Sequence, residues 1–322
     1  MNEKIEKYRI LCETENSIPL FSQAWWLDAV AGENNWDVVI IERNKEIIAS
    51  MPFMLTKRLG VISLSQPKLT QSLGPWIKET NSKYAKRLSL EKDLMNELID
   101  KLPEFDIFQQ NWNLNMTNWL PFFWKGFAQT TRYTYILPLI SDSKKLWEGL
   151  QDNIRSDIKK AQNKYKLSVR SDLPIRDFIK LQQKTFERQN IAMQIPLDLI
   201  ERLDQECSKR KIRKMMIAVD EMGRHHAGIY IVWDHQSAYY LMSGGDPLLR
   251  NSGATSYLLW EAINFASSVT ASFDFEGSMM EPIERFFRAF GAKQTPYFSI
   301  SKIKSRRLRI KTKIIELISC LK

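Results

Sequence analysis

Residues 239–254, YYLMSGGDPLLRNSGA, carry the pattern that decides the fold. An apolar run ends in Ser243, Gly244 and Gly245, and a loop containing Arg250 then leads through Gly253 into the apolar stretch 254–267. This order is typical of a strand, a glycine-containing loop and a helix. Backbone N–H groups at such a helix N-terminus suit an anion such as a diphosphate. Loops of this kind also serve turn geometry alone, so the loop by itself is a weak indication.

The flanking sequence extends this motif into a larger unit. Hydrophobic periodicity predicts helices over 153–165, 175–189, 197–210, 254–267 and 282–290, and strands over 215–219, 227–233, 238–243, 272–276 and 297–302. The first half has a weaker form of the same order, with strands over 8–13, 36–42, 47–55, 106–110 and 129–137 and helices over 22–32 and 88–102.

This repetition predicts an α/β (α+β) fold made of two tandem domains, each a mixed, mostly antiparallel sheet flanked by helices. The domains are expected at residues 1–137 and 138–302. A basic amphipathic helix is expected over 303–322, with Ile310, Ile314, Leu317 and Leu321 on one face.

Composition excludes several classes of protein. The 322 residues include three His and three scattered Cys, which argues against a disulfide framework and against a zinc site. We therefore expect no metal cofactor. No stretch resembles a signal peptide or a membrane span, so the expected location is the cytoplasm.

The net charge of +10 is unevenly distributed. Residues 1–135 contain 16 basic and 16 acidic side chains, whereas 136–322 contain 31 and 21. The excess lies mainly in 144–188, with 12 basic against 6 acidic, and in 302–322, with 8 against 1. This pattern indicates contact with an anionic partner at two places, or basic faces that are only solvated.

Several segments give the chain a family resemblance when taken in order. They are Phe21-Ser22-Gln23-Ala24-Trp25-Trp26, Arg155-x-x-Ile158-Lys159-Lys160-Ala161, Thr185-x-x-Arg188, Phe273-Asp274-Phe275-Glu276-Gly277-Ser278 and Phe286-Phe287-Arg288-Ala289-Phe290-Gly291-Ala292. The second half resembles the acyl-CoA-binding core of GNAT-superfamily acyltransferases. More narrowly, about residues 5–302 resemble the FemAB-type branch, which contains peptidoglycan-bridge aminoacyltransferases.

The resemblance implies two GNAT-like domains, a degenerate acceptor-side domain followed by a donor-side domain, with an acceptor cleft between them. The co-substrate would be an acyl-CoA or an aminoacyl-tRNA. Two departures stand out: many members have Lys where this chain has Phe287, and the loop lacks the fuller glycine pattern. The donor-binding candidates are Ser243, Gly244, Arg250, Ser252, Gly253 and Ala254.

Acyl transfer to an amine requires a deprotonated amine and a stabilised oxyanion. Asp274 and Glu276 lie two residues apart on a predicted strand and would share one face, so either carboxylate is a candidate to orient or deprotonate the acceptor. The alternative is that Asp274 caps locally or pairs with Arg285 or Arg288. Strand N–H groups near 243–245 would supply the oxyanion contact, with Tyr240 or Tyr239 as proton donor.

Substrate contacts are expected elsewhere in the chain. Arg155 and Lys159 share a helix face and would contact a phosphate-bearing substrate or tRNA, or be solvated. Arg188 ends the next helix. Trp25 is either a stacking platform or part of the core. The histidines at 225, 226 and 235 flank turns and are expected to be exposed.

These features favour an N-acyltransferase of FemAB-like GNAT type that acts on a primary amine of a cell-envelope precursor such as peptidoglycan. The alternatives are an acetyl-CoA-dependent small-molecule N-acetyltransferase and a non-catalytic GNAT-like module that binds RNA or an anionic membrane. The basic helix at 303–322 would contact the inner face of the membrane, touch RNA or dock on the protein. The sequence does not indicate an oligomeric state.

Overall fold

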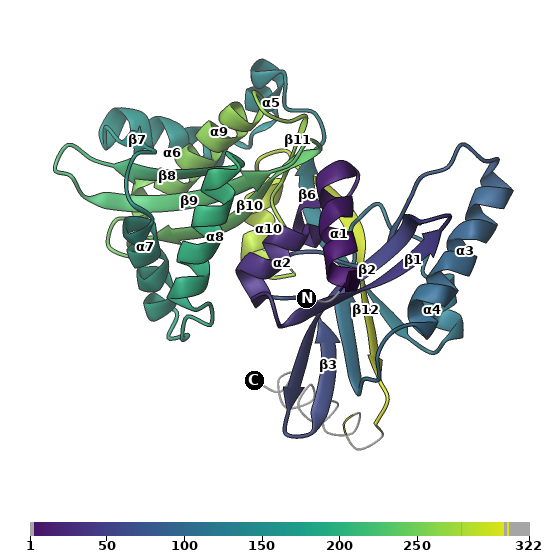
Figure 1. The fold of residues 1–322 in the computed structure, drawn as a ribbon. Helices are drawn as coiled ribbons and strands as arrows, with labels where there is room; N and C mark the ends of the chain where they lie inside the picture. The colour runs from purple at the N-terminus through teal and green to yellow at the C-terminus, as the bar shows by residue number, and fades with distance from the viewer. Residues whose placement is uncertain (1–2, 278, 306–307, 309–322) are drawn as a thin grey trace. The chain divides into compact units, whose positions relative to one another are not determined.

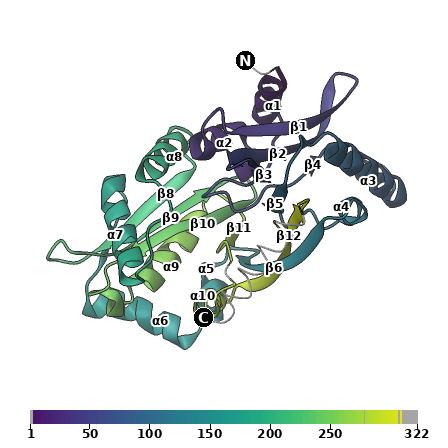
Figure 2. The same cartoon turned by 90° about the horizontal axis from the view of Figure 1, so that it is seen from below.

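The computed structural model describes residues 3–277, 279–305 and 308 (Figures 1 and 2). These residues form two compact units. The first contains the described residues up to Arg132 together with those from Pro296 onward, and the second runs from Tyr133 to Thr295.

The sheet of the first unit is mixed. Its strands are β1 (Trp36–Arg43), β2 (Glu46–Arg58), β3 (Val61–Ser65), β5 (Ile107–Asn111) and the last part of β12 (Lys293–Ile303), in that spatial order. The short β4 (Trp76–Ile77) pairs with β2. β3 and β5 pair in parallel. The strands predicted over residues 36–42 and 47–55 are confirmed as β1 and β2, which form an antiparallel hairpin.

The first unit has four α-helices in the described part of the chain: α1 (Glu3–Thr14), α2 (Ala24–Ala31), α3 (Tyr84–Asp100) and α4 (Leu120–Trp124). A 3₁₀ turn, η1, covers Leu20–Ser22. The strand predicted over residues 8–13 is wrong, because this segment belongs to α1. Its one buried side chain is Tyr8, whose hydroxyl donates to the Ser22 carbonyl at 2.7 Å.

The sheet of the second unit has the spatial order β6 (Ala128–Leu137, within this unit from Tyr133), β11 (Ser272–Asp274), β10 (Ser237–Gly245), β9 (His225–Trp233), β8 (Arg213–Val219) and β7 (Ser168–Arg170). The β10–β11 pair is parallel and the other pairs are antiparallel. The predicted meander over residues 215–243 is therefore confirmed.

Helices cover both faces of this sheet. They are α5 (Ser143–Gly149), α6 (Asp152–Lys159) continuing into a π-helical turn η2 (Lys160–Lys164), α7 (Ile175–Arg188), α8 (Leu197–Lys209), the 3₁₀ turn η3 (Arg250–Ser252), α9 (Ala254–Ala266) and α10 (Glu281–Arg288). On β9, Ile229 and Ile231 pack into the core that contains α6 and α9. Tyr230 points the other way, contacting Phe178 of α7 and Asp204 of α8.

Two further predictions concern membrane-spanning segments and the C-terminal helix. Among the described residues, no helix has both the length and the apolar character needed to cross a bilayer. The helix predicted over 303–322 lies outside the described residues, apart from 303–305, where β12 ends, and 308.

Candidate active site

The candidate site lies where β10 and β11 separate. The two strands pair over three positions, the last being Tyr239 opposite Asp274. β11 ends there, whereas β10 continues to Gly245 with a bulge at Leu241 against β9. Beyond Tyr239, the edge of β10 has polar backbone groups that β11 does not pair. An acyl carbonyl placed at this edge would meet N–H donors.

Asp274 is buried at the end of β11, with 6% of its surface exposed. Its carboxylate accepts hydrogen bonds from the Thr134 hydroxyl of β6 and, at 2.8 Å, from the Glu276 backbone N–H. Burial raises the pKa of Asp274 to about 6, against the opposing effect of these hydrogen bonds. The alternative of a pair with an arginine is wrong, because Arg285 and Arg288 contact Glu281 and Glu284. The alternative of local capping agrees with the hydrogen bond from the Glu276 N–H.

Glu276 sits in a strained turn beyond the strand. The strand predicted over 272–276 is too long: it ends at Asp274, and Glu276 adopts a left-handed φ of 62°. Alternation along a strand therefore does not relate the two side chains; the contact between the two residues is the hydrogen bond from the Glu276 backbone N–H to the Asp274 carboxylate. A positive φ at a residue other than glycine is costly and is often kept at functional sites.

Gly277 holds this turn against β6. Its φ is 58°, and a Cβ added there would lie 2.2 Å from the Tyr133 carbonyl oxygen. Burial raises the pKa of Glu276 well above its ordinary value, and the charges of Asp274 and Asp234 raise it further. Glu276 is thus a half-buried carboxyl group whose raised pKa favours the uptake of a proton.

Three further residues lie around Asp274 and Glu276. Sequence patterns do not indicate Asp234 and Thr134, and they favour Tyr240 over Tyr239. Tyr239, named only as an alternative to Tyr240, lies beside Asp274, and its hydroxyl donates to Asp234 at 3.1 Å. Burial raises the pKa of Tyr239, and Asp234, Asp274 and Glu276 raise it further. Asp234 also accepts backbone N–H groups in its own turn, so in the sequence it has the character of a turn residue. Thr134 carries no sequence signal.

Tyr240 points to the opposite face of β10. It is 9% exposed and packs edge-to-face on Phe287, with 5.9 Å between ring centroids. Burial raises the pKa of its hydroxyl to about 12. The structure therefore places Tyr240 in the core and not with the carboxyl cluster, which leaves Tyr239 as the tyrosine of the site. Phe287 is likewise a core residue, 5% exposed.

At the start of the donor loop, the glycines serve close packing. A Cβ at Gly244 would lie 2.4 Å from the backbone nitrogen of Gln182 in α7, so only glycine allows this approach. The N–H of Gly245 donates to the Thr185 hydroxyl at 2.8 Å. Ser243 is exposed beside them.

The second half of the loop fits a phosphate-bearing donor. Gly253 has a φ of 80°, and its missing Cβ would meet the Asp157 carbonyl at 2.3 Å, so it lets α6 approach α9. Ser252 is 1% exposed, and its hydroxyl has no hydrogen-bond partner in the described part of the chain. Arg250 is exposed and forms no ion pair with a described residue. With Ala254 opening α9, these groups offer a cation and N–H donors at one helix N-terminus.

Of the four candidate substrate-binding residues, two are exposed and two make contacts within the protein. Arg155 donates to the carbonyls of Glu148 and Leu150 at 3.2 and 2.5 Å and pairs with Asp152, so it caps the end of α5. Lys159 and Arg188 are exposed and have no ion-pair partner among the described residues. In the first unit, Trp25 is half-buried and packs edge-to-face on Trp26 at 5.5 Å, as a core residue does.

One prediction about the histidines is wrong. His226 is only 1% exposed, and its Nε2 lies 3.1 Å from the Asp220 carboxylate. Pairing of β8 with β9 buries this position, which sequence proximity to a turn does not reveal. Among the described residues, no group of three or more His, Cys, Asp or Glu side chains is placed to hold a metal ion.

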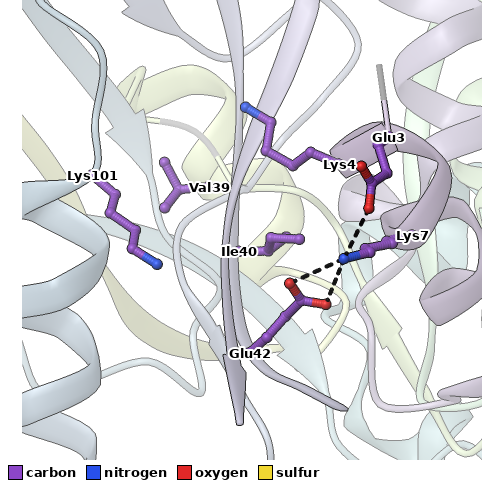
Figure 3. Close-up of a pocket in the computed structure, with 7 residues that line it drawn as sticks. All are labelled: Glu3, Lys4, Lys7, Val39, Ile40, Glu42 and Lys101. Carbon is purple, nitrogen blue, oxygen red and sulfur yellow. Dashed lines mark hydrogen bonds and ion pairs between the residues drawn. The ribbon is translucent and has the colours of Figure 1, made fainter. Parts of the chain in front are cut away.

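A cavity of about 580 Å³ lies in the first unit, apart from the predicted site residues (Figure 3). It is lined by Glu3, Lys4, Lys7, Val39, Ile40, Glu42 and Lys101. Its charges largely compensate one another: Lys7 lies 3.3 Å from Glu3 and 3.1 Å from Glu42, and Lys4 pairs with Asp37 at 2.8 Å. We assign it no ligand.

Comparison with known proteins gives a domain match in the second unit and a fold match over both units. Residues 150–281 match the model of the acetyltransferase (GNAT) domain. This stretch is therefore similar to a GNAT acetyltransferase domain. The matched range contains both the donor loop and the carboxyl cluster at Asp274 and Glu276. No curated protein sequence matches the chain significantly.

Solved structures extend the likeness over both units. The chain is similar to FemX, with a TM-score of 0.70 at 11% identity, covering 96% of this chain and 98% of FemX. It is also similar to the C-terminal domain of a putative lysylphosphatidylglycerol synthetase from Agrobacterium fabrum, with a TM-score of 0.58 at 11% identity and coverages of 93% and 91%. A tandem GNAT protein from the clavulanic acid biosynthesis pathway matches at 0.53 and 9% identity, with coverages of 94% and 95%.

These likenesses establish the fold. The predicted α/β class with two tandem GNAT-like domains is confirmed, as is the resemblance to FemAB-like GNAT proteins. At the level of activity, the GNAT domain indicates an acyltransferase. The donor and acceptor roles of the two domains stay predictions.

Proposed function

We propose that this chain is an N-acyltransferase that moves an acyl or aminoacyl group onto a primary amine, with Glu276 as the proton acceptor. The observation that carries the proposal is the position of Glu276: a carboxyl group of raised pKa lies in a strained turn where β10 and β11 separate. Its presence within the GNAT-matched range supports the same reaction class.

The chemistry follows from the groups around Glu276. The acceptor ammonium loses one proton to the Glu276 carboxylate, and the free amine attacks the acyl carbonyl carbon. N–H groups on the β10 edge beyond Tyr239 stabilise the oxyanion. The bond from the carbonyl carbon to the leaving sulfur or oxygen then breaks, and the leaving group takes the second nitrogen proton. Asp274 acts as a positioning residue, because it holds the Glu276 backbone.

The donor would be held by its phosphate groups. Arg250, the Ser252 hydroxyl and the first-turn N–H groups of α9 are suited to the diphosphate of an acyl-CoA, the donor common to GNAT enzymes. An aminoacyl-tRNA, implied by the FemAB-like resemblance, also presents phosphates. In that case the exposed Lys159 and Arg188 would add cationic contacts.

For the acceptor, we favour the primary amine of a cell-envelope precursor. Support comes from the shared fold with FemX and with a putative lysylphosphatidylglycerol synthetase domain. Such an acceptor would place the chain in the cytoplasm at the inner face of the membrane. An acetyl-CoA-dependent N-acetyltransferase with a small amine as acceptor is the nearest alternative.

Transfer assays with three donors test this proposal: acetyl-CoA, a longer acyl-CoA and charged tRNA, each with a peptidoglycan-precursor amine and with small amines. Glu276→Gln should lower kcat about 10²- to 10⁴-fold. The control Glu281→Gln changes an exposed glutamate that pairs only with Arg285, and should leave kcat unchanged. Equal kcat for Glu276→Gln and the wild type would remove Glu276 from the mechanism.

A binding module without catalysis is a second candidate, favoured by one observation. Phe287 occupies a position where many members of the resembling branch have Lys, and it packs against Tyr240 and Phe275 in the core. Absence of transfer with all three donors, together with binding of one of them, would support this alternative and overturn the enzyme proposal.

A further inference from the structure

The turn that joins β2 and β3 has an unusual residue. Its two central residues, Leu59 and Gly60, have φ values of 50° and 77°. Two positive φ values define the type I′ hairpin turn, which prefers Asn followed by Gly. The β1–β2 turn of the same sheet follows this preference at its first position, with Asn44 and Lys45 at 53° and 67°. Leucine at the first position is therefore unfavourable, because its Cβ makes a positive φ costly.

Packing does not offset this cost. Leu59 is 95% exposed, the highest value among the large apolar side chains of the described residues. The residue thus neither suits the turn nor contributes to the core. An exposed apolar side chain on a strained backbone indicates contact with another molecule or surface.

The charged residues next to Leu59 in the sequence are both basic. Lys57 and Arg58 precede it, both exposed, and neither forms an ion pair with a described residue. No acidic residue occurs from 55 to 61. An exposed apolar side chain at the tip of a turn, next to basic side chains, is complementary to an anionic lipid surface.

The basic C-terminal stretch starts at the same end of this sheet (Figure 1). Ser63 of β3 pairs with Ile107 of β5, and Ile107 pairs with Ile303 of β12. Asp106 connects the start of β3 with the residue that follows β12. Its carbonyl accepts the Lys304 N–H and its carboxylate accepts the Ile62 N–H, each at 2.9 Å. Residues 302–322, with 8 basic side chains against 1 acidic, thus begin close to the base of the β2–β3 turn.

We propose that the β2–β3 turn is a membrane-contact site, in which Leu59 enters the acyl-chain boundary of an anionic bilayer and Lys57 and Arg58 contact lipid phosphates. The isolated aliphatic side chain favours lipid over RNA, because single-stranded RNA is bound by stacking on aromatic or planar side chains. This site is independent of the proposed acyl transfer.

A second hairpin offers a matched control. The β8–β9 turn carries Met222, which is 77% exposed, but its neighbours are Asp220 and Glu221. Arg224 and Lys166 pair with these two carboxylates, so the turn has a similar apolar tip without the excess of basic side chains next to Leu59, and anionic lipid should not attract it.

Sedimentation of the full chain with vesicles tests the proposal. Vesicles of phosphatidylglycerol and phosphatidylcholine should bind the protein, whereas pure phosphatidylcholine vesicles should bind it much less, and added salt should weaken binding. Leu59→Asn should lower the partition coefficient roughly tenfold, because one buried leucine is lost. Lys57→Gln should lower it about fivefold. Met222→Asn should leave it unchanged.

The design separates folding from binding. Asparagine suits a type I′ turn, so the Tm of Leu59→Asn should equal or exceed that of the wild type. Leu59→Gly is a second variant compatible with the same φ. Wild-type partitioning by both variants, no binding of the wild type to anionic vesicles, or Leu59-dependent binding of RNA with none to vesicles would each overturn the proposal. Transfer to a soluble amine without vesicles reports separately on the proposed activity.

Discussion

The backbone N–H of Glu276 donates to the Asp274 carboxylate at 2.8 Å, across the point where β11 ends. This bond stabilises the left-handed turn at Glu276, directly after the buried Asp274. Burial raises the pKa of Glu276, and the charge of ionised Asp274 raises it further because it opposes a second negative charge. Asp274 therefore couples the geometry of the turn to the proton affinity of Glu276.

The pH dependence of transfer should reveal this coupling. Glu276 must be deprotonated to accept a proton, so kcat/KM should fall as pH falls through its raised pKa. Asp274→Asn removes the neighbouring charge but keeps an oxygen that can accept the Glu276 N–H. The acidic limb should then move to lower pH. An unmoved limb in Asp274→Asn would show that another group controls it.

Stability should depend on pH through Asp274. Its folded pKa of about 6 lies above the ordinary value of 3.8, so the folded state binds more protons between these values. Its contribution is fully present below pH 3.8 and is lost as pH rises through 6. Relative to wild type, Asp274→Asn should gain roughly 3 kcal/mol between pH 4 and 8. Urea unfolding at both pH values measures this difference; a constant difference would contradict it.

Gly277→Ala should disrupt the turn. The added Cβ would lie 2.2 Å from the Tyr133 carbonyl, and φ is 58°. We expect a loss of about 3 kcal/mol or more of unfolding free energy. Gly223→Ala is the control: φ is 75° there, but no atom lies within 4 Å, so only about 1 kcal/mol should be lost. Similar losses in both variants, measured in urea, would contradict the close approach.

Arg250→Glu should weaken donor binding. The change places a negative charge at the N-terminus of α9, where donor phosphates are proposed to bind. Calorimetry with acetyl-CoA should show an increase in Kd of about 10- to 100-fold. Arg176→Glu, which makes the same charge change at an exposed residue of α7, should leave Kd unchanged. Unaltered affinity in Arg250→Glu would move the donor site elsewhere.

Arg155→Ala should act on stability. The guanidinium group caps carbonyls at the end of α5, so its removal should cost about 1–3 kcal/mol. Lys159→Ala, one helical turn away and exposed, should cost less than about 0.5 kcal/mol. Thermal unfolding of both variants checks this contrast. Loss of donor affinity in Arg155→Ala without loss of stability would instead assign Arg155 to substrate binding.

Much of the fold was predictable because its signals are local. The meander of β8, β9 and β10 has continuous apolar runs separated by turns, and the glycine before α9 marks the helix entrance. The segment around Tyr8 misled, because its alternating apolar residues also fit one face of a helix. In the helical conformation, the buried Tyr8 side chain donates a hydrogen bond to the Ser22 carbonyl.

The sequence by itself determined the α/β order, and it identified the loop at 243–254 and the carboxyl groups of Asp274 and Glu276 as candidates, since each depends on residues close together in the chain. Only the tertiary structure decided which neighbours act on them. The Thr134 hydroxyl reaches Asp274 across 140 residues because β6 pairs with β11, and Tyr239 replaces Tyr240 because parallel pairing places it beside Asp274. The pKa of Glu276 likewise depends on burial and on carboxyl groups that folding brings together. These are effects of strand register and desolvation, which no local pattern encodes.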